Sequence, residues 1–188
     1  MKVLKTKIPD VKLFEPKIFG DSRGYFFESF NAKELVDLIP SVEFVQDNES
    51  LSEFGVIRGL HVQRPPFAQA KLIRVIKGRV FDVAVDLRED SPTRGQHVDV
   101  ILDDQKKQQL YIPKGFAHGF LVLSETAIFS YKVDQYYNLD AELTLKWDDP
   151  TLDIGWPLRK DKYQFSDKDE KGLTWKDFPK YSSREWQL

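Results

Sequence analysis

The sequence predicts an all-β protein that forms one domain over residues 1–188. Short runs rich in Val, Ile, Phe and Tyr alternate with clusters of Gly, Pro and Asp at intervals of roughly 8 to 12 residues, a spacing typical of β-sandwiches and barrels. Helix signals are confined to one short stretch and to the last part of the chain. A chain of 188 residues suits one domain with a substantial core, because roughly 70% of the unfolded surface is buried at that size.

The expected strands follow the apolar and β-branched runs in chain order. They are Val11–Phe19, Tyr25–Phe30, Glu43–Leu51, Val56–Val62, Ala70–Ile76, Arg79–Asp86, Gln96–Leu102, Gln108–Ile112, His118–Leu123, Thr126–Val133 and Glu142–Trp147. One short helix interrupts them, because Asn31 can cap it, Glu34 stands at the capping-box position and Pro40 ends it. Beyond Pro150 the pattern weakens, and we expect loops with one or two helical turns that pack on the same domain.

Alternation along the strands places polar side chains on an otherwise apolar inner face. Lys71 falls in register with Ile73 and Val75, and Asp82 lies on the face opposite to Phe81. The face that begins at Ala127 and Phe129 ends in the phenol of Tyr131. A barrel lined in this way can form a small-ligand pocket.

Composition excludes several classes of protein. The chain has no cysteine, which excludes disulfides, thiolate metal sites and a cysteine nucleophile. It has 28 Lys and Arg against 30 Asp and Glu, so no overall positive field favours nucleic acid or anionic lipid. The N-terminus lacks a signal-peptide core, and no segment reaches the ~18 apolar residues of a membrane span. We therefore expect a cytoplasmic protein without nucleic-acid or membrane partners.

The chain has three histidines, and two of them stand in motifs of small and apolar residues, Arg58-Gly59-Leu60-His61 and Pro113-Lys114-Gly115-Phe116-Ala117-His118. Imidazole is the side chain that exchanges a proton near pH 7, so His61 and His118 are each a candidate base, ligand or core residue. His97 lies among polar residues and is assigned to the surface.

Pro113-x-Gly115-x-x-His118 resembles the later of the two motifs of the cupin jelly-roll barrels. The earlier cupin motif has two histidines one residue apart and a glutamate, whereas this chain reads His61-Val62-Gln63. Two imidazoles and a glutamine near a lysine ammonium make a poor site for a divalent cation. The remaining groups suit proton transfer next to a carbonyl, with a base, an enolate-stabilising cation and an acid on the opposite face, roles that His61, Lys71 and Tyr131 could fill.

From about Phe14 to about Asp169 the chain closely resembles the dTDP-4-dehydrorhamnose 3,5-epimerases. The most specific stretches are Asp21–Glu28, Phe44–Ser50, Arg58–Gln63, Gln69–Val75, Phe81–Arg88, Ser91–Thr93, Ile112–Phe120 and Trp147–Pro150. The resemblance implies a cupin-type jelly roll with a few short peripheral helices, and epimerisation of dTDP-4-dehydro-6-deoxy-D-glucose at C3 and C5 to dTDP-4-dehydro-L-rhamnose.

The same resemblance implies a role for each site residue. His61 is the base, Asp169 orients it, Lys71 polarises the C4 keto oxygen and Tyr131 is the proton donor. Tyr137 stacks on thymine. The other residues expected to bind the sugar or the diphosphate are Arg23, Phe26, Glu28, Gln46, Asp47, Asn48, Arg58, His118, Glu142 and Lys168. Asp82 supports His118.

The family works without a cofactor or a metal, as a homodimer, so Arg23, Phe26 and Glu28 are expected to serve the partner's site. Three positions depart from the family pattern: Val62 and Arg94 replace aromatic residues, and Glu49 stands where His is common. Related enzymes epimerise one carbon only. Three alternatives to double epimerisation therefore stay open for this protein. It could be a mono-epimerase, a metal-dependent cupin isomerase or dioxygenase, or a non-catalytic barrel that binds a sugar nucleotide.

Overall fold

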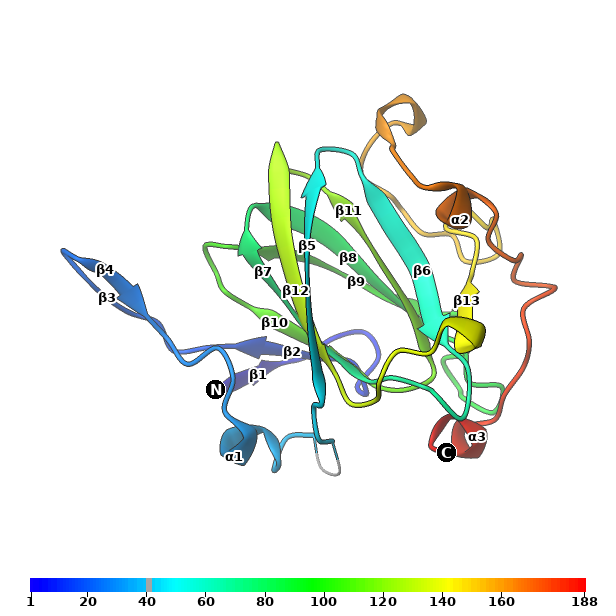
Figure 1. Ribbon diagram of the computed structural model, residues 1–188, viewed down its shortest axis with the longest axis horizontal. Helices are drawn as coiled ribbons and strands as arrows, with labels where there is room; N and C mark the ends of the chain where they lie inside the picture. The colour runs from blue at the N-terminus through cyan, green and yellow to red at the C-terminus, as the bar shows by residue number, and fades with distance from the viewer. Residues whose placement is uncertain (40–41) are drawn as a thin grey trace.

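Two antiparallel sheets face each other in the computed structural model, which describes residues 1–39 and 42–188 (Figure 1). The six-stranded sheet has the order β1 (Lys2–Leu4), β2 (Lys12–Glu15), β10 (Gln109–Ile112), β7 (Lys71–Lys77), β12 (Thr126–Val133) and β5 (Gln46–Glu53). The five-stranded sheet has the order β13 (Glu142–Thr144), β6 (Ile57–Gln63), β11 (Phe116–Val122), β8 (Arg79–Asp86) and β9 (His97–Asp103). This architecture confirms the all-β prediction.

The hydrophobic core fills the space between the two sheets. Ile73 and Val75 of β7 meet Ala84 of β8 there, and the rings of Phe120 and Phe129 stack with their centroids 4.1 Å apart. Alternating side chains of each strand point inward, which is why the core draws on both sheets. The same alternation turns Lys71 and Asp82 inward, as the sequence predicts, and both are buried. Asp86 and His118 are buried as well.

The outer face of the five-stranded sheet is covered by the C-terminal part of the chain. Phe81, Val83 and Val85 pack there with Trp147 and Trp186. Four short helices flank the strands of this half: η1 (Leu139–Ala141), η2 (Lys160–Lys162), α2 (Asp167–Glu170) and α3 (Ser183–Trp186). Ser166 and Ser182 begin α2 and α3 with capping boxes, which fix where these helices start. The expected packing of the tail on the β body is confirmed.

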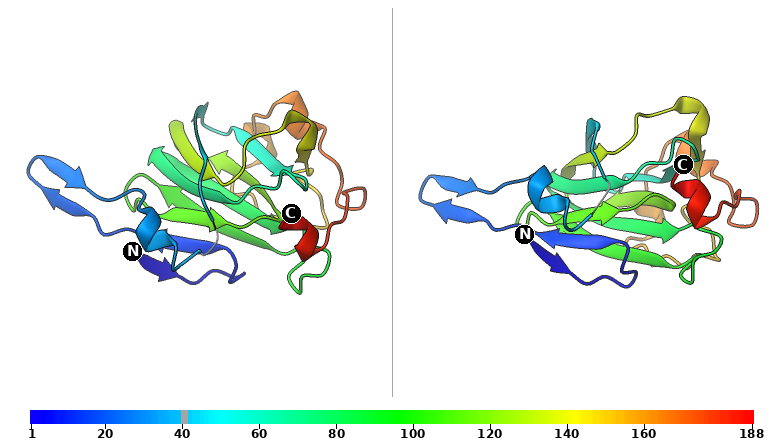
Figure 2. Two further views of the ribbon diagram at one scale, coloured as in Figure 1. Left: turned by 60° about the horizontal axis from the view of Figure 1, so that its bottom comes forward. Right: turned by 90° about the horizontal axis from the view of Figure 1, so that it is seen from below.

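The β3–β4 hairpin, Phe19–Asp21 and Gly24–Phe26, projects from the body in every view (Figures 1 and 2). The expected strand Val11–Phe19 is therefore wrong in extent: the pairing of β2 ends at Glu15, before Pro16, which has no backbone N–H to donate. The expected strand Tyr25–Phe30 ends at Phe26, because β3 is too short to pair further.

The remaining sequence boundaries differ by a few residues. Helix α1 is shorter than expected, covering Ala32–Leu35. Asn31 caps it by accepting from the backbone N–H groups of Lys33 and Glu34, as predicted. Glu34 instead accepts from the N-terminal ammonium at 3.4 Å. The predicted end at Pro40 lies outside the described residues. Strand β1 was not predicted, and the last expected strand ends at Thr144 rather than Trp147.

The packing of Trp186 predicts that the last helix is part of the stable fold. Its indole is fully buried and meets the ring of Tyr181 edge-on at 5.3 Å. Trp186→Ala should lower the free energy of unfolding by ~3–5 kcal/mol, because it leaves a large cavity. Chemical denaturation with a circular dichroism readout measures this. The matched control is Leu188→Ala, two residues on and 74% exposed, which should change stability by less than about 0.5 kcal/mol. Equal, small effects would mean that the tail is not part of the cooperative unit.

Candidate active site

A cavity of about 490 Å³ opens between the two sheets at the end where β5, β6 and β13 lie. Its walls carry most of the residues that the sequence singles out. These are Asp47, Asn48, Arg58, His61, Lys71, His118, Tyr131, Tyr137, Glu142 and Lys168. This volume lies within the range of about 300–1,000 Å³ that is usual for small-ligand pockets.

His61 is held by a carboxylate from the C-terminal part of the chain. Asp169 Oδ1 lies 2.7 Å from His61 Nε2 and also accepts from the backbone N–H of Gly59 at 3.0 Å. Its other oxygen accepts from the Ser166 hydroxyl at 2.6 Å. Burial would raise the pKa of Asp169, but the hydrogen bonds from His61, Ser166 and Gly59 outweigh it and lower the pKa to about 2. Asp169 is therefore a fixed negative charge at neutral pH.

This contact decides which ring nitrogen of His61 is basic. An ionised carboxylate only accepts hydrogen bonds, so Nε2 carries the proton and the lone pair of the neutral ring lies on Nδ1. The His61 side chain is 27% exposed and lines the cavity. His61 thus presents an oriented base to whatever enters.

His61 lies directly opposite His118 because β6 and β11 approach closely. The two histidines are register partners. Gly59 has φ +133°, and a Cβ there would lie 2.5 Å from the Cα of Gly119, so neither strand could carry a side chain at this crossing. His118 Nε2 lies 3.0 and 3.1 Å from the two carboxylate oxygens of Asp82, which is fully buried. Burial lowers the pKa of His118, against the opposing effect of Asp82.

Lys71 brings a buried cation to the wall of the cavity. It begins β7 and is 9% exposed. Burial lowers its pKa from 10.5 to about 8, although the carboxylates of Asp82 and Glu142 partly restore it. Its ammonium lies 6.0 Å from the ring centroid of Tyr131. A cation with few protein partners in a dry site interacts strongly with a developing oxyanion.

Tyr131 projects into the cavity from the wall opposite His61. It belongs to β12 of the six-stranded sheet, whereas His61 belongs to β6 of the five-stranded sheet. Burial raises the pKa of Tyr131, and Glu142 raises it further. The phenol is therefore protonated at neutral pH. The arrangement places a base and a potential acid on two sides of one cavity, with the Lys71 ammonium beside them.

Polar side chains surround the mouth of the cavity. Glu142 pairs with Lys168 and accepts from the hydroxyl of Tyr137 at 2.9 Å. Burial would raise the pKa of Glu142, and the Lys168 and Tyr137 contacts lower it. On the facing strand β5, Asn48 accepts from Gln46 at 2.8 Å. Such groups can bind the hydroxyls and phosphates of a ligand.

A family model described as dTDP-4-dehydrorhamnose 3,5-epimerase matches residues 5–177. The chain belongs to this family. It is 52% identical over 178 residues to the dTDP-4-dehydrorhamnose 3,5-epimerase of Shigella flexneri, covering 94% of this chain and 97% of that protein. The sequence-based resemblance is thereby confirmed, and the chain is an isomerase of the epimerase type.

Solved structures of related epimerases share the fold. The dTDP-6-deoxy-D-glucose-3,5-epimerase of Legionella pneumophila, solved with dTDP-4-keto-L-rhamnose, is 50% identical with a TM-score of 0.86 over 89% of each chain. A 3′-monoepimerase from Streptomyces bikiniensis, solved with dTDP-quinovose, is 29% identical with a TM-score of 0.87, covering 96% of this chain and 93% of that chain. The predicted cupin-type fold is confirmed by these neighbours.

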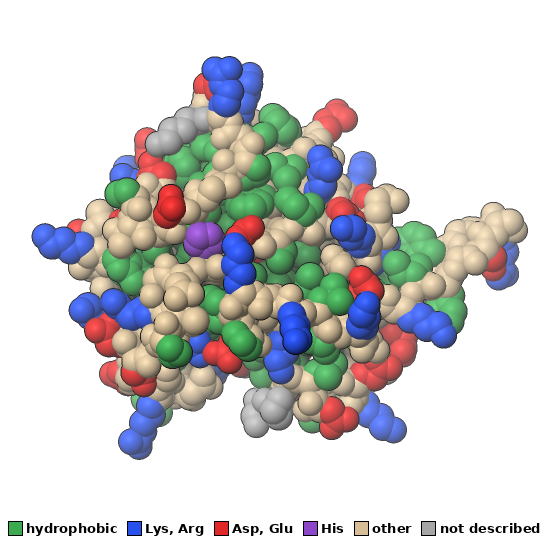
Figure 3. Space-filling model, turned by 180° about the vertical axis from the view of Figure 1, so that it is seen from behind, with side chains coloured by type: hydrophobic (Ala, Val, Ile, Leu, Met, Phe, Trp, Pro, Cys, Tyr) green, Lys and Arg blue, Asp and Glu red, His purple; other side chains and the backbone are tan. Residues whose placement is uncertain are grey.

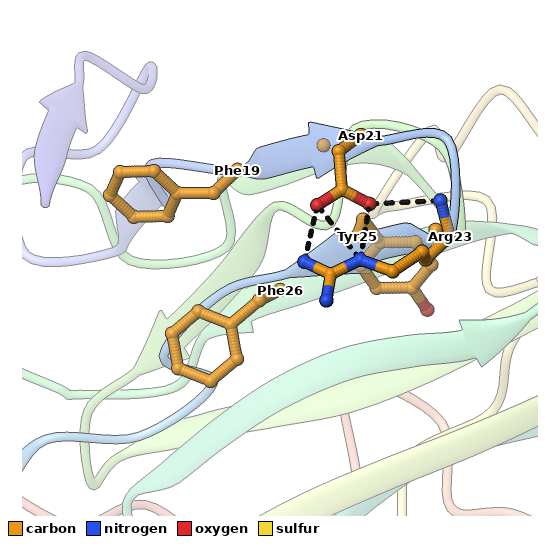
Figure 4. A pocket seen from close by; sticks show the side chains of 7 residues that line it. Phe19, Asp21, Arg23, Tyr25 and Phe26 are labelled. Atoms are coloured by element: carbon orange, nitrogen blue, oxygen red, sulfur yellow. Dashed lines mark hydrogen bonds and ion pairs between the residues drawn. The ribbon is translucent and has the colours of Figure 1, made fainter.

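Three expected binding residues of this epimerase lie away from its own cavity. Arg23 and Phe26 are on the β3–β4 hairpin, where the Arg23 guanidinium folds back onto the Asp21 carboxylate at 2.6 Å (Figure 4). Glu28 accepts from the side chain of Asn31 at 3.2 Å. None of the three lines the cavity of its own chain.

The cavity of this epimerase also has lining residues that sequence reasoning missed. Gln63 and Gln69 stand two positions from His61 and Lys71, so strand alternation could have found them. Ser50 follows Asn48 in the same way. Phe120 and Phe129, which stack in the core between the sheets, form part of the cavity wall as well, and Glu49 and Val62 complete it. Gln46 acts less directly, since both ends of its carboxamide bond to protein groups.

Metal and surface features add little to this site. Within residues 1–39 and 42–188, no group of three or more His, Asp or Glu side chains is placed to hold a metal ion. No helix among the described residues is long and apolar enough to cross a membrane. On the face that Figure 3 shows, acidic and basic side chains are interspersed rather than gathered by sign.

Proposed function

We propose that this cavity epimerises dTDP-4-dehydro-6-deoxy-D-glucose at C3 and C5 to dTDP-4-dehydro-L-rhamnose, with the site residues acting as follows. The single observation that carries the proposal is the position of His61 and Tyr131 on opposite walls, with the Lys71 ammonium between the sheets. Inversion of a carbon next to a ketone requires removal of its proton from one face and return of a proton to the other. The names of the related epimerases support the substrate class.

His61 begins the reaction by removing the proton from C3 or C5. Its Nδ1 lone pair is the base, because Asp169 holds the proton on Nε2. Asp169 also stabilises the imidazolium that forms, as a fixed anion 2.7 Å away. The electron pair of the broken C–H bond moves to the C4 oxygen, which becomes an enolate. Lys71, protonated, stabilises that negative charge.

Tyr131 completes the inversion by donating its phenol proton to the opposite face of the enolate carbon. The electron pair returns from the C4 oxygen to form the new C–H bond, and the ketone is restored. Before the next step, the Tyr131 phenolate takes up a proton from solvent and the His61 imidazolium releases its proton to solvent. The raised pKa of Tyr131 keeps it in the protonated form needed for this role.

The remaining cavity residues hold the sugar nucleotide. Arg58, whose Nε donates to the Ser52 hydroxyl at 3.0 Å, can turn its remaining N–H groups to the diphosphate. His118, Asp47, Asn48, Glu142 and Lys168 are available to the sugar hydroxyls and the phosphates. Tyr137 is 48% exposed at the mouth, where its ring can stack on thymine.

The proposed unit is a cytoplasmic homodimer of one-domain subunits. The hairpin exposes Phe19, Tyr25 and Phe26 by 53%, 60% and 65%, and Figure 4 shows Phe19 and Phe26 projecting to the same side. Such a hairpin is typical of a segment covered by another molecule. We place it on a second copy of the chain, where Arg23, Phe26 and Glu28 complete the partner's cavity.

The first prediction concerns proton exchange at the substrate. In heavy water, the protein should exchange both the C3 and the C5 protons of dTDP-4-dehydro-6-deoxy-D-glucose and invert both carbons, as followed by NMR. Exchange at one carbon alone would instead indicate a mono-epimerase, a reaction that the Streptomyces bikiniensis relative carries out. Binding without exchange would indicate a non-catalytic barrel. Loss of exchange with EDTA and its return with metal would indicate a metal-dependent cupin.

The opposite positions of His61 and Tyr131 predict that their variants fail differently. His61→Ala should slow exchange and inversion together by about 10²- to 10⁴-fold, because no enolate forms without the base. Tyr131→Phe keeps the ring but removes the acid, so solvent exchange should continue while inversion falls. NMR time courses in heavy water measure the rate of solvent exchange and the rate of inversion on one sample. Parent-rate inversion in Tyr131→Phe would remove Tyr131 from the mechanism.

The depressed pKa of Lys71 predicts an alkaline limit to activity. The side chain stabilises the enolate only when protonated, so the contribution of Lys71 to kcat/KM should be full only well below pH 8 and should fall as the pH rises through the Lys71 pKa of about 8. Lys71→Arg, which stays protonated throughout, should be less active but should lose this limb. The same limb in Lys71→Arg would assign the titration to another group.

Subunit mixing tests the shared site. Arg23→Ala and His61→Ala should each be nearly inactive alone. In a mixed dimer, one cavity combines an intact His61 with the partner's intact hairpin, so refolding the two variants together should restore about a quarter of the parental activity. Mixed Arg23→Ala and Tyr131→Phe chains should behave in the same way. Differently tagged chains show whether mixed dimers form. If they form and activity does not recover, Arg23 serves the cavity of its own subunit and not that of the partner.

A further inference from the structure

The segment 134–138 connects the two sheets at the mouth of the cavity. It leaves the end of β12 in the six-stranded sheet and reaches η1 and β13 beside β6 (Figure 1). It carries Tyr137, whose ring stacks on the thymine base in the proposed function. Half of the Tyr137 side chain is open to solvent, and its hydroxyl donates to Glu142. An exposed connection of this kind is usually mobile unless its backbone is tied down.

Three glutamine side chains bond to the backbone of this segment. Gln69 donates its carboxamide N–H to the carbonyl oxygen of Gln135 at 2.7 Å. Gln46 accepts from the N–H of Tyr137 at 3.2 Å, and Gln63 accepts from the N–H of Asn138 at 2.9 Å. The three bonds therefore hold the backbone at Tyr137 itself, at Gln135 before it and at Asn138 after it.

The three glutamines come from separate supports. Gln46 begins β5 in one sheet, Gln63 ends β6 in the other, and Gln69 precedes β7. Gln63 is 4% exposed, so its side chain has little freedom. The carboxamide of Gln46 is further fixed by its N–H donating to Asn48. Movement of Tyr137 away from the mouth would require breaking bonds to both walls of the cavity.

We propose that Gln46, Gln63 and Gln69 are positioning residues that hold segment 134–138 so that the nucleobase site exists before the substrate arrives. This inference rests on the proposed stacking of Tyr137 on thymine. A segment that is already ordered pays no ordering cost when the ligand binds, so preorganisation appears as affinity. The clamp does not touch the reacting carbons. Its loss should therefore weaken binding of the nucleotide and leave the chemical step nearly unchanged.

A double-mutant cycle between Gln63 and Tyr137 tests this, with dTDP binding measured by calorimetry and turnover measured on the dTDP-sugar. Gln63→Leu keeps the size of the side chain and leaves the Asn138 N–H unpaired. It should raise the Kd for dTDP and the KM about tenfold, with kcat within about twofold. In the Tyr137→Ala background, the same change should have no further effect on the Kd, because the ring it positions is gone.

The matched control is Gln164→Leu. The Gln164 carboxamide also donates to a distant backbone carbonyl, that of Phe54 at 2.9 Å, but it lies outside the cavity lining. This variant should bind dTDP with the parental Kd. If Gln63→Leu does not fold, as judged by its thermal transition, Gln69→Leu enters the same cycle.

Two outcomes would overturn the clamp. Additive losses of dTDP affinity in the double variant would mean that Gln63 contacts the ligand directly, and a fall in kcat at constant KM would mean that it serves the chemistry. A failure of the proposed function is distinct from both: Tyr137→Ala would bind dTDP as tightly as the parent, or the parent would bind no dTDP.

Discussion

The hydrogen bond between His61 and Asp169 is the contact on which the chemistry of the site depends. It joins residues 108 positions apart, and it decides which nitrogen of His61 is the base. Asp169 is held in its place by the backbone N–H of Gly59 in β6 and by the hydroxyl of Ser166, which begins α2 with a capping box. The C-terminal part of the chain therefore contributes a group to the site as well as covering the outer face of the five-stranded sheet.

The interior of the barrel gives the other groups their chemical character. Burial lowers the pKa of Lys71 to about 8 and raises the pKa of Tyr131, since a dry site disfavours both the ammonium and the phenolate. The carboxylates of Asp82 and Glu142 partly offset the unfavourable burial of the Lys71 ammonium. The glycine crossing at Gly59 and Gly119 brings His61 and His118 face to face. A ligand would thus meet oriented polar groups together with the rings of Phe120 and Phe129, in a protein whose net charge is only −2.

Local sequence pattern could predict the inner faces but not the long-range partners. Period-two alternation correctly turned Lys71, Asp82 and Tyr131 inward, because a strand in a sandwich must bury one face. The Asp169 contact came from family resemblance, since no local rule links a tail carboxylate to a strand histidine. The β3–β4 hairpin was read as parts of longer strands, because its Phe and Tyr residues have strand-like composition while both of its faces remain exposed. The sequence does not identify Gln63 and Gln69 as positioning residues, although alternation places them on the faces of His61 and Lys71, because an uncharged carboxamide carries no local signal of which backbone group it will bond to.

The tautomer of His61 is the most direct test of this account. The chain has three histidines, so ¹⁵N-histidine labelling gives few signals, and His61→Ala assigns the one that matters. At a pH where the ring is neutral, the account predicts a protonated Nε2 and an unprotonated Nδ1 in His61, and a loss of this preference in Asp169→Ala. A neutral His61 with its proton on Nδ1 in the parent protein would contradict the account, because the lone pair would then face Asp169 and not the substrate.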